Sequence, residues 1–220
     1  MNTSASIIEN PGKSSFAGRI VSSKLFWILS ITFLFGFPII RSVKRELPNP
    51  LPVLGQVPDF SFIDENEKTF GSRDLKGKVY IANFMFTSCQ TSCPLLLKRV
   101  QKVQHRIRGV IDRAAIVSFT VDPEVDTPKV LYDKAREYKA NPNVWRFLTS
   151  TKEEVKNLLI DGFKVPMGEK ELAGSVWDVA HSNKLVLVDQ KGQIRGYYDT
   201  TDDSINHLMI DTGLVINQKL

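Results

Sequence analysis

The sequence predicts a layered α/β domain behind a single N-terminal membrane helix. Apolar runs at 79–86 and 114–121 have the length and composition of strands that are buried on both faces. Segments with helical spacing of apolar residues alternate with these strands, which is typical of an α/β domain with its chemistry at the strand ends. A third observation, the uncharged run 25–40, predicts the membrane helix.

Length and charge restrict the function classes. The chain has 220 residues, of which 42% are hydrophobic and 24% are charged, so it can build one buried core. Its formal net charge is +5, but residues 1–50 hold six Lys or Arg against two Asp or Glu, which leaves the body nearly neutral. A neutral body lacks the positive surface that phosphate-backbone binding needs, so we expect no nucleic acid partner. Two cysteines are too few for a disulfide-held scaffold, so we expect them to serve local chemistry.

The uncharged run 25–40 is bounded by Lys24 and Arg41. Its sixteen residues would reach about 24 Å as a helix, and extension back to residue 20 brings the helix close to the roughly 30 Å hydrocarbon core. A cleaved signal peptide is the alternative, but no small-x-small cleavage site follows Ile40. The predicted organisation is a short basic tail at 1–19, a transmembrane anchor at 20–41, a proline-rich linker at 42–55 and the domain at 56–220.

The first half of the domain is predicted to contain a hairpin, a central strand and a helix. Phe60 and Phe62 alternate with a polar residue before an acidic turn, which indicates a short hairpin. The run 79–86 follows as the central strand. After Cys93, apolar residues recur at helical spacing with basic residues between them, which predicts an amphipathic helix. These apolar residues are Leu96, Leu97, Val100, Val103 and Ile107.

The second half continues the alternation of strands and helices. Thr127 and either Ser150 or Thr151 are expected to cap helices, because their side chains can accept hydrogen bonds from first-turn amides. The expected elements are a strand at 114–121, a helix from Thr127 to about Lys139, a strand at 144–148, a helix through Ile160, paired strands at 185–189 and 194–198, and a helix at 203–216.

Both cysteines lie where the central strand gives way to the first helix. Pro94 lacks an amide hydrogen, so it is expected at the first helical position, with Cys93 as the cap and Cys89 in the preceding loop. A cysteine at a helix start is expected to have a lowered thiol pKa, because unpaired amides favour the thiolate. The spacing allows either a disulfide or a metal site, and both chemistries remain open.

A soft-metal site would need a further ligand, and the chain has three histidines. His105 and His207 fall within predicted helices, where solvated or packed roles are expected. His181 lies in a loop immediately before the strand at 185–189, where it could face a neighbouring strand end. Two thiolates and one imidazole suit copper, whereas a structural zinc site would usually take a fourth protein ligand.

Four blocks of sequence occur in a fixed order along the chain. They are 86–94 after the buried strand, 120–128, 145–149, and His181 before a strand that ends at 189–192. In order and spacing, over about residues 55–218, these blocks resemble the Sco/SenC family of membrane-anchored, thioredoxin-like copper proteins. The sequence departs from the usual family pattern at Gln90, where a proline is common, and at Ala180, where an acidic residue is common.

The resemblance implies a thioredoxin-type fold and copper, as Cu(I) or Cu(II), bound by Cys89, Cys93 and His181. It also implies a supporting role for Asp122, whereas Asp126 is more simply expected to be a helix-start residue. The implied function is delivery of copper to the dinuclear copper site of cytochrome c oxidase, with the copper-site subunit of that oxidase as partner. The domain would lie outside the bacterial cytoplasm or in the mitochondrial intermembrane space, attached to the membrane by the anchor.

A thiol–disulfide oxidoreductase is the second hypothesis. On this hypothesis Cys89 and Cys93 are a redox pair, of which one attacks a partner's disulfide and the other resolves the mixed disulfide. The substrate would be the cysteines of the oxidase subunit or of another extracytoplasmic partner, and a thioredoxin-like reductant would regenerate the pair. Whether the chain is an enzyme depends on which hypothesis holds.

Overall fold

The computed structural model describes residues 23–43, 50–89, 92–165, 171–173, 176–178 and 183–218. The chain divides into two units, Met1–Asn49 and Pro50–Leu220. The expected basic tail at 1–19 lies outside the described residues, as do Gln90, Ala180 and the candidate ligand His181.

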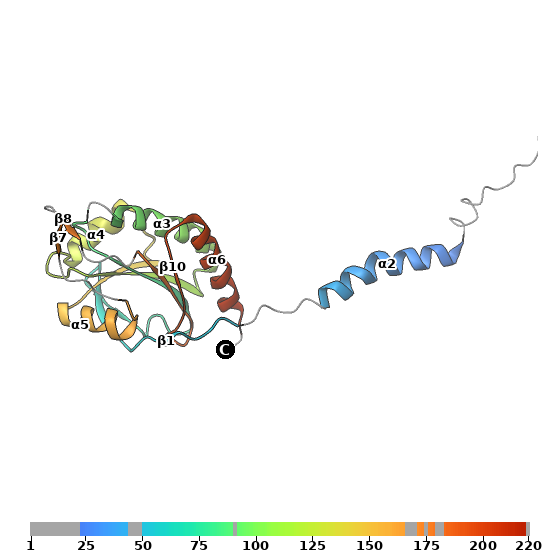
Figure 1. Cartoon of the computed structure of the whole chain (residues 1–220), viewed down its shortest axis with the longest axis horizontal. Coiled ribbons are helices and arrows are strands. Elements are labelled where there is room, and N and C mark those ends of the chain that lie inside the picture. The colour runs from blue at the N-terminus through green and yellow to red at the C-terminus, as the bar shows by residue number, and fades with distance from the viewer. Residues whose placement is uncertain are drawn as a thin grey trace, which may run out of the picture. The chain divides into compact units, whose positions relative to one another are not determined.

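An eight-stranded mixed sheet forms the middle layer of the second unit (Figure 1). The strand order is β1-β10-β9-β4-β5-β6-β2-β3, and the three central neighbours β4, β5 and β6 run parallel. The other pairs in this sheet are antiparallel. The strands are β1 (Gly55–Gln56), β2 (Ser61–Asp64), β3 (Thr69–Gly71), β4 (Val79–Met85), β5 (Ala114–Thr120), β6 (Trp145–Thr149), β9 (Leu185–Val188) and β10 (Gln193–Tyr198). A separate antiparallel pair consists of β7 (Glu171–Ala173) and β8 (Val176–Asp178).

Helices cover both faces of the sheet, which gives the domain its layers (Figure 1). Leu97 of α3, Leu131 of α4 and Leu208 of α6 share one core cluster with Ile81 of β4. Val155 of α5 belongs to a second cluster on the opposite face. The helices are α3 (Ser92–Ile107), the short η1 (Arg108–Val110), α4 (Pro128–Glu137), α5 (Lys152–Asn157) continued by the π-helical turn η2 (Leu158–Gly162), and α6 (Asp202–Asn217).

Local sequence accounts for most of these elements. Every residue of β4 and β5 is buried, as expected for strands covered on both faces. The hydroxyl of Thr127 caps α4, and Thr151 forms a reciprocal capping box with Glu154 at the start of α5. The predicted hairpin, strands and helices of the domain are therefore confirmed, with boundaries that differ by a few residues. The pair β7–β8 was not expected, and β1 begins at Gly55 inside the predicted linker.

Aromatic rings fill the core on the α5 side of the sheet. Phe119 of β5 lies 5.3 Å from Phe60, 5.9 Å from Phe62, 6.0 Å from Phe84 and 5.3 Å from Phe163, measured between ring centroids. Phe119 itself is fully buried. The cysteines belong to the cluster on the other face, so this aromatic group and the candidate site lie on opposite sides of the sheet.

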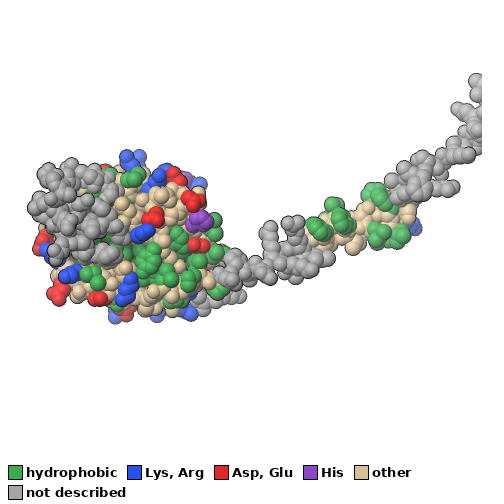
Figure 2. All heavy atoms as spheres, viewed as in Figure 1, with side chains coloured by type: hydrophobic (Ala, Val, Ile, Leu, Met, Phe, Trp, Pro, Cys, Tyr) green, Lys and Arg blue, Asp and Glu red, His purple; other side chains and the backbone are tan. Residues whose placement is uncertain are grey.

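The first unit contains one described helix, α2 (Lys24–Val43), which includes the apolar run. The consecutive side chains from Leu25 to Leu29 are all exposed, and Figure 2 shows hydrophobic side chains along the face of the helix that is in view. Across the described residues, however, no helix combines the length and the apolar character needed to cross a membrane. The transmembrane anchor predicted at 20–41 is therefore not confirmed.

Candidate functional site

The two cysteines follow the carboxyl end of β4, where parallel strands usually present their chemistry. Cys89 lies in the loop after the strand, and Cys93 lies in the first turn of α3. Both side chains are only 6% exposed, and neither cysteine forms a disulfide. Burial of Leu96 and Leu97 against the sheet fixes the start of α3, which brings Cys93 to the strand end.

A hydrogen bond joins the two cysteines. The Cys93 amide donates to the Cys89 sulfur at 3.3 Å, and the Cys89 amide donates to the Phe86 carbonyl at 3.4 Å. The Cys89 sulfur thus satisfies one of the amides that a helix leaves unpaired in its first turn. The expectation that Pro94 is the first helical residue and Cys93 the cap is wrong, because α3 begins at Ser92. Pro94 is tolerated there because first-turn amides have no intrahelical acceptor to lose.

The expected lowering of the Cys93 thiol pKa is also wrong. The pKa of this thiol is raised to about 12, and burial is the largest cause. A hydrogen bond to the Phe86 backbone lowers the pKa, whereas a hydrogen bond between the Cys93 and Cys89 side chains and the charges of Cys89 and Asp126 raise it. Desolvation therefore outweighs the hydrogen bond at Phe86, and the Cys93 thiol is protonated at neutral pH.

This protonation predicts slow alkylation of Cys93 in the reduced chain. Because the thiolate is the reactive form, the rate of modification by iodoacetamide should rise about tenfold per pH unit from pH 7 to about pH 11. A thiol of lowered pKa would instead reach a constant rate near neutral pH. Mass spectrometry of the Cys93 peptide at successive pH values measures the rate, and a plateau below pH 9 would contradict the raised pKa.

A buried carboxyl group lies beside the cysteines. Asp126 is 0% exposed, and its carboxyl group accepts hydrogen bonds from the Thr87 amide at 3.0 Å, the Thr87 hydroxyl and the Thr120 hydroxyl at 2.5 Å. The pKa of Asp126 is raised above its usual value, chiefly by burial and to a lesser extent by the neighbouring Asp122. The hydrogen bonds from Thr120 and Thr87 act in the opposite direction. Asp126 directly precedes Thr127, the cap of α4, as expected of a helix-start residue, but its buried carboxyl group also connects the loop after β4 with the end of β5, which was not expected.

Asp122, the expected supporting residue, is itself buried at 7% exposure in the loop after β5. Its amide donates to the Thr120 hydroxyl at 3.0 Å, and its carbonyl accepts from the Asp126 amide at 2.9 Å. The structure thus brings Asp122 into the same buried network as Asp126. One available signal for Asp126 was the group of three acidic residues, Asp122, Glu124 and Asp126, in the loop after a buried strand, since the end of that strand neighbours the end of β4.

No group of three or more His, Cys, Asp or Glu suited to a metal is found within the described ranges. His105 is exposed on α3 beside Arg108, and His207 is exposed on α6 with its Nε2 atom 3.7 Å from Asp203. β9 runs antiparallel to β4, and Val186 pairs with Ala82, so the chain enters β9 from the end of the sheet at which β4 finishes. Cys89 and Cys93 lie beyond the same end of the sheet.

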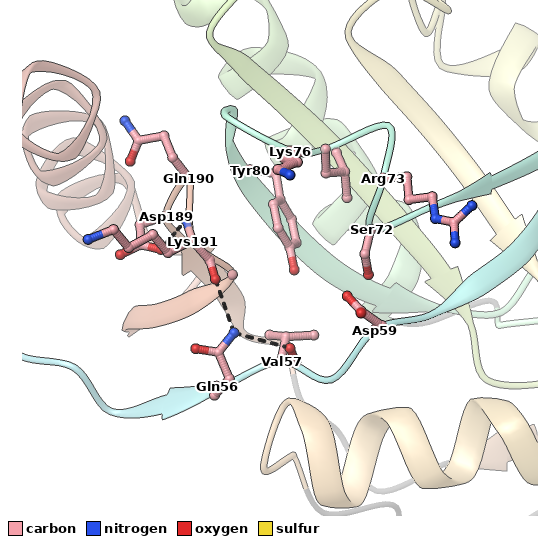
Figure 3. A pocket seen from close by; sticks show the side chains of 12 residues that line it. Gln56, Val57, Asp59, Ser72, Arg73, Lys76, Tyr80, Asp189, Gln190 and Lys191 are labelled. Carbon is pink, nitrogen blue, oxygen red and sulfur yellow. Dashed lines mark hydrogen bonds between the residues drawn. The ribbon is translucent and has the colours of Figure 1, made fainter. Parts of the chain in front are cut away.

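A separate cavity of about 480 Å³ lies at the opposite end of β4 (Figure 3). Tyr80, the second residue of the strand, points its hydroxyl into this cavity near Ser72 and Asp59 (Figure 3). Burial raises the pKa of the Tyr80 phenol well above its usual range. Because the cavity and the cysteines flank opposite ends of one strand, the cavity is not part of the two-cysteine site.

Comparisons with known proteins agree with this arrangement. Residues 54–212 match the family model described as SCO1/SenC. The SCO1 protein homolog of Bacillus subtilis is 30% identical over 165 residues, which cover 73% of this chain and 81% of that protein.

Two solved structures extend the similarity to the fold. BsSco, a member of the Sco family of cytochrome c oxidase assembly proteins in which a disulfide switch is described, gives a TM-score of 0.68 at 26% identity and covers 78% of this chain and 100% of its own. Yeast Sco1 with copper bound gives a TM-score of 0.57 at 26% identity and covers 71% of this chain and 87% of its own.

Proposed function

The chain belongs to the SCO1/SenC family, and from that membership and the paired thiols we propose that it binds copper and delivers it to cytochrome c oxidase during assembly. The observation that carries the proposal is the hydrogen bond between two buried cysteines, neither of which forms a disulfide, after the end of β4. Thiolates are soft ligands that favour Cu(I), and a sulfur and nitrogen donor set also holds Cu(II). The acceptor is proposed to be the copper-site subunit of the oxidase.

Cys89, Cys93 and His181 are the proposed ligands. The antiparallel pairing of β9 with β4 supports the inclusion of His181, because Leu185 begins β9 four residues after it in the sequence. The raised pKa of Cys93 means that copper must displace a proton from this sulfur. The affinity of the chain for copper should therefore increase with pH. Such proton coupling suits a carrier, since protonation of the thiol favours release to the acceptor.

Copper titration of the full-length chain tests this function. The thiols are reduced, oxygen is excluded, and Cu(I) and Cu(II) are titrated separately against competing chelators. We expect one copper ion per chain and a loss of Cu(II) affinity of more than about tenfold in His181→Ala, because imidazole supplies the nitrogen ligand.

The chain offers matched controls for that substitution. His105→Ala and His207→Ala remove exposed helical imidazoles and should leave both copper affinities unchanged. If His181→Ala binds Cu(II) as tightly as the unaltered chain, the assignment of His181 is wrong. If the unaltered chain binds neither ion, the copper function itself fails.

Thiol–disulfide exchange is the second candidate function, and the adjacency of two reduced thiols favours it. Cys89 would attack a disulfide of the partner and form a mixed disulfide, with the partner's second sulfur leaving as a thiolate. Cys93 would then resolve this bond, which leaves the partner with two thiols and the chain with a disulfide. A thioredoxin-like reductant must return the pair to the dithiol form.

The chain is proposed to act at a membrane surface, with its domain outside the bacterial cytoplasm or in the mitochondrial intermembrane space. The exposed apolar side chains of α2 support this attachment, because side chains such as Leu25 and Phe33 would otherwise remain in water. Membranes washed with alkaline carbonate should retain the full chain and release a chain that lacks residues 1–49. Release of both would contradict the attachment.

A further inference from the structure

We propose that Asp126 is a positioning residue of the two-cysteine site, because its buried carboxyl group holds the loop that carries Cys89 against the end of β5. The inference rests on the proposed copper function and names a residue on which that function depends. Asp126 does not need to touch the metal in this role. It acts through Thr87, which lies two residues before Cys89.

The contacts of Asp126 join two loops that follow neighbouring parallel strands. From the loop after β4, both the amide and the hydroxyl of Thr87 donate to the carboxyl group. From the end of β5, the Thr120 hydroxyl donates to it at 2.5 Å. The Val121 amide also donates to the Met85 carbonyl at 2.9 Å, so the two strand ends are joined beside the carboxyl group. The Asp126 side chain therefore adds a direct link between the two loops to the backbone pairing of the strands that precede them.

The connection continues from Thr87 to both sulfur atoms. The Cys89 amide donates to the Phe86 carbonyl, which closes a turn from Phe86 to Cys89 that includes Thr87. The Cys89 sulfur then accepts the Cys93 amide hydrogen at 3.3 Å. The carboxyl group thus lies at one end of a hydrogen-bonded path whose other end is the start of α3.

Stability alone does not account for a carboxyl group at this position. Burial of a carboxyl group is costly even when its oxygens are hydrogen-bonded, and an apolar residue often packs at least as stably. Helix capping does not require Asp126 either, since the Thr127 hydroxyl caps α4. What the carboxyl group supplies is geometry, because two oxygens can receive Thr87 and Thr120 at the same time. An apolar side chain of similar size would leave the amide of Thr87 without that acceptor.

Two substitutions at this position test the proposal in the reduced full-length chain. Asp126→Ala removes every acceptor, so the Cu(I) dissociation constant should increase about 10- to 100-fold, the range seen when a group that orients a ligand is lost. Asp126→Asn keeps one oxygen for the Thr87 amide and places an amide group against the Thr120 hydroxyl, so it should recover most of the affinity. The reduction potential of the Cys89–Cys93 pair, measured in parallel, should shift in Asp126→Ala and return towards the original value in Asp126→Asn.

Asp189 provides a matched control at the other end of the sheet. It is 1% exposed, and its carboxyl group accepts hydrogen bonds from the Lys191 amide at 2.8 Å and the Gln193 amide at 2.9 Å. Asp189→Ala should lower stability in urea without changing the copper affinity of the folded chain or the reduction potential. If Asp189→Ala and Asp126→Ala weaken copper binding equally, affinity merely follows stability and the positioning role is wrong.

The remaining outcomes are also decisive. Unchanged copper affinity and an unchanged reduction potential in folded Asp126→Ala would overturn the proposal. If Asp126→Ala does not fold, Thr87→Val replaces it, since it removes the hydroxyl partner from a half-buried residue and should weaken Cu(I) binding several-fold. If the unaltered chain binds no copper, the proposed function fails, but the shift in reduction potential still tests the positioning role.

Discussion

Replacement of either cysteine with serine should remove tight copper binding. Loss of a group that merely orients a metal ligand costs about 10- to 100-fold in affinity, so loss of a ligand itself should cost more than about 100-fold. Serine is nearly the same size as cysteine but does not ionise near neutral pH, and its oxygen is a harder donor than sulfur. Cys89→Ser and Cys93→Ser should therefore both lose Cu(I) in a competition titration against a chromophoric chelator.

Ser88→Ala is a suitable control for these variants. Ser88 lies in the same loop as Cys89, and its side chain is exposed, so its removal should change neither folding nor affinity. Urea unfolding of each variant shows that the loss of copper occurs in a folded chain. A cysteine whose replacement leaves the affinity unchanged is not a ligand.

The same variants separate copper delivery from disulfide exchange. If the chain is an oxidoreductase in which Cys89 attacks, Cys93→Ser should accumulate a mixed disulfide with its partner, because the resolving thiol is missing. A carrier alone would form no such species while still losing copper. Non-reducing gel electrophoresis of extracts from cells that express the variant detects the mixed disulfide.

Much of the domain could be predicted from the sequence because its central strands and helix caps are local signals. The run 79–86 is apolar throughout, and Thr127 and Thr151 precede their helices at the distance that capping requires. The strands β1 and β7 had no comparable signal, since they contain only two and three residues. Their pairing depends on partners elsewhere in the fold, which periodicity does not report.

The candidate site could be predicted in position but not in electrostatics. Pro94 correctly indicated that a helix begins near the cysteines, whereas the pKa of Cys93 depends on how deeply the tertiary structure buries that helix start. Asp126 was hidden for a similar reason, because an aspartate before a threonine and a proline is an ordinary helix-start pattern. Only the pairing of β4 with β5 brings its carboxyl group to Thr87.

Replacement of Phe119 with alanine should have the largest effect on stability. The ring is fully buried and contacts four other aromatic rings, so its removal leaves a large cavity in the core. Phe-to-Ala changes of this kind cost about 3–5 kcal/mol of unfolding free energy. Because whole domains are stable by only about 5–15 kcal/mol, the loss should be obvious in urea or guanidinium titrations. Phe119→Leu keeps most of the volume and should lose only a fraction of that amount.

The stability loss should not extend to the chemistry of the cysteines. Successive side chains of a strand point to opposite faces, so Phe119 lies on the α5 side whereas the next residue, Thr120, faces the side of Cys89 and Cys93. Folded Phe119→Ala should therefore bind copper with the affinity of the unaltered chain, even though less of it is folded at a given urea concentration. A loss of affinity as large as that of the cysteine variants would show that core packing across the sheet, and not only the loops at its edge, determines the geometry of the site.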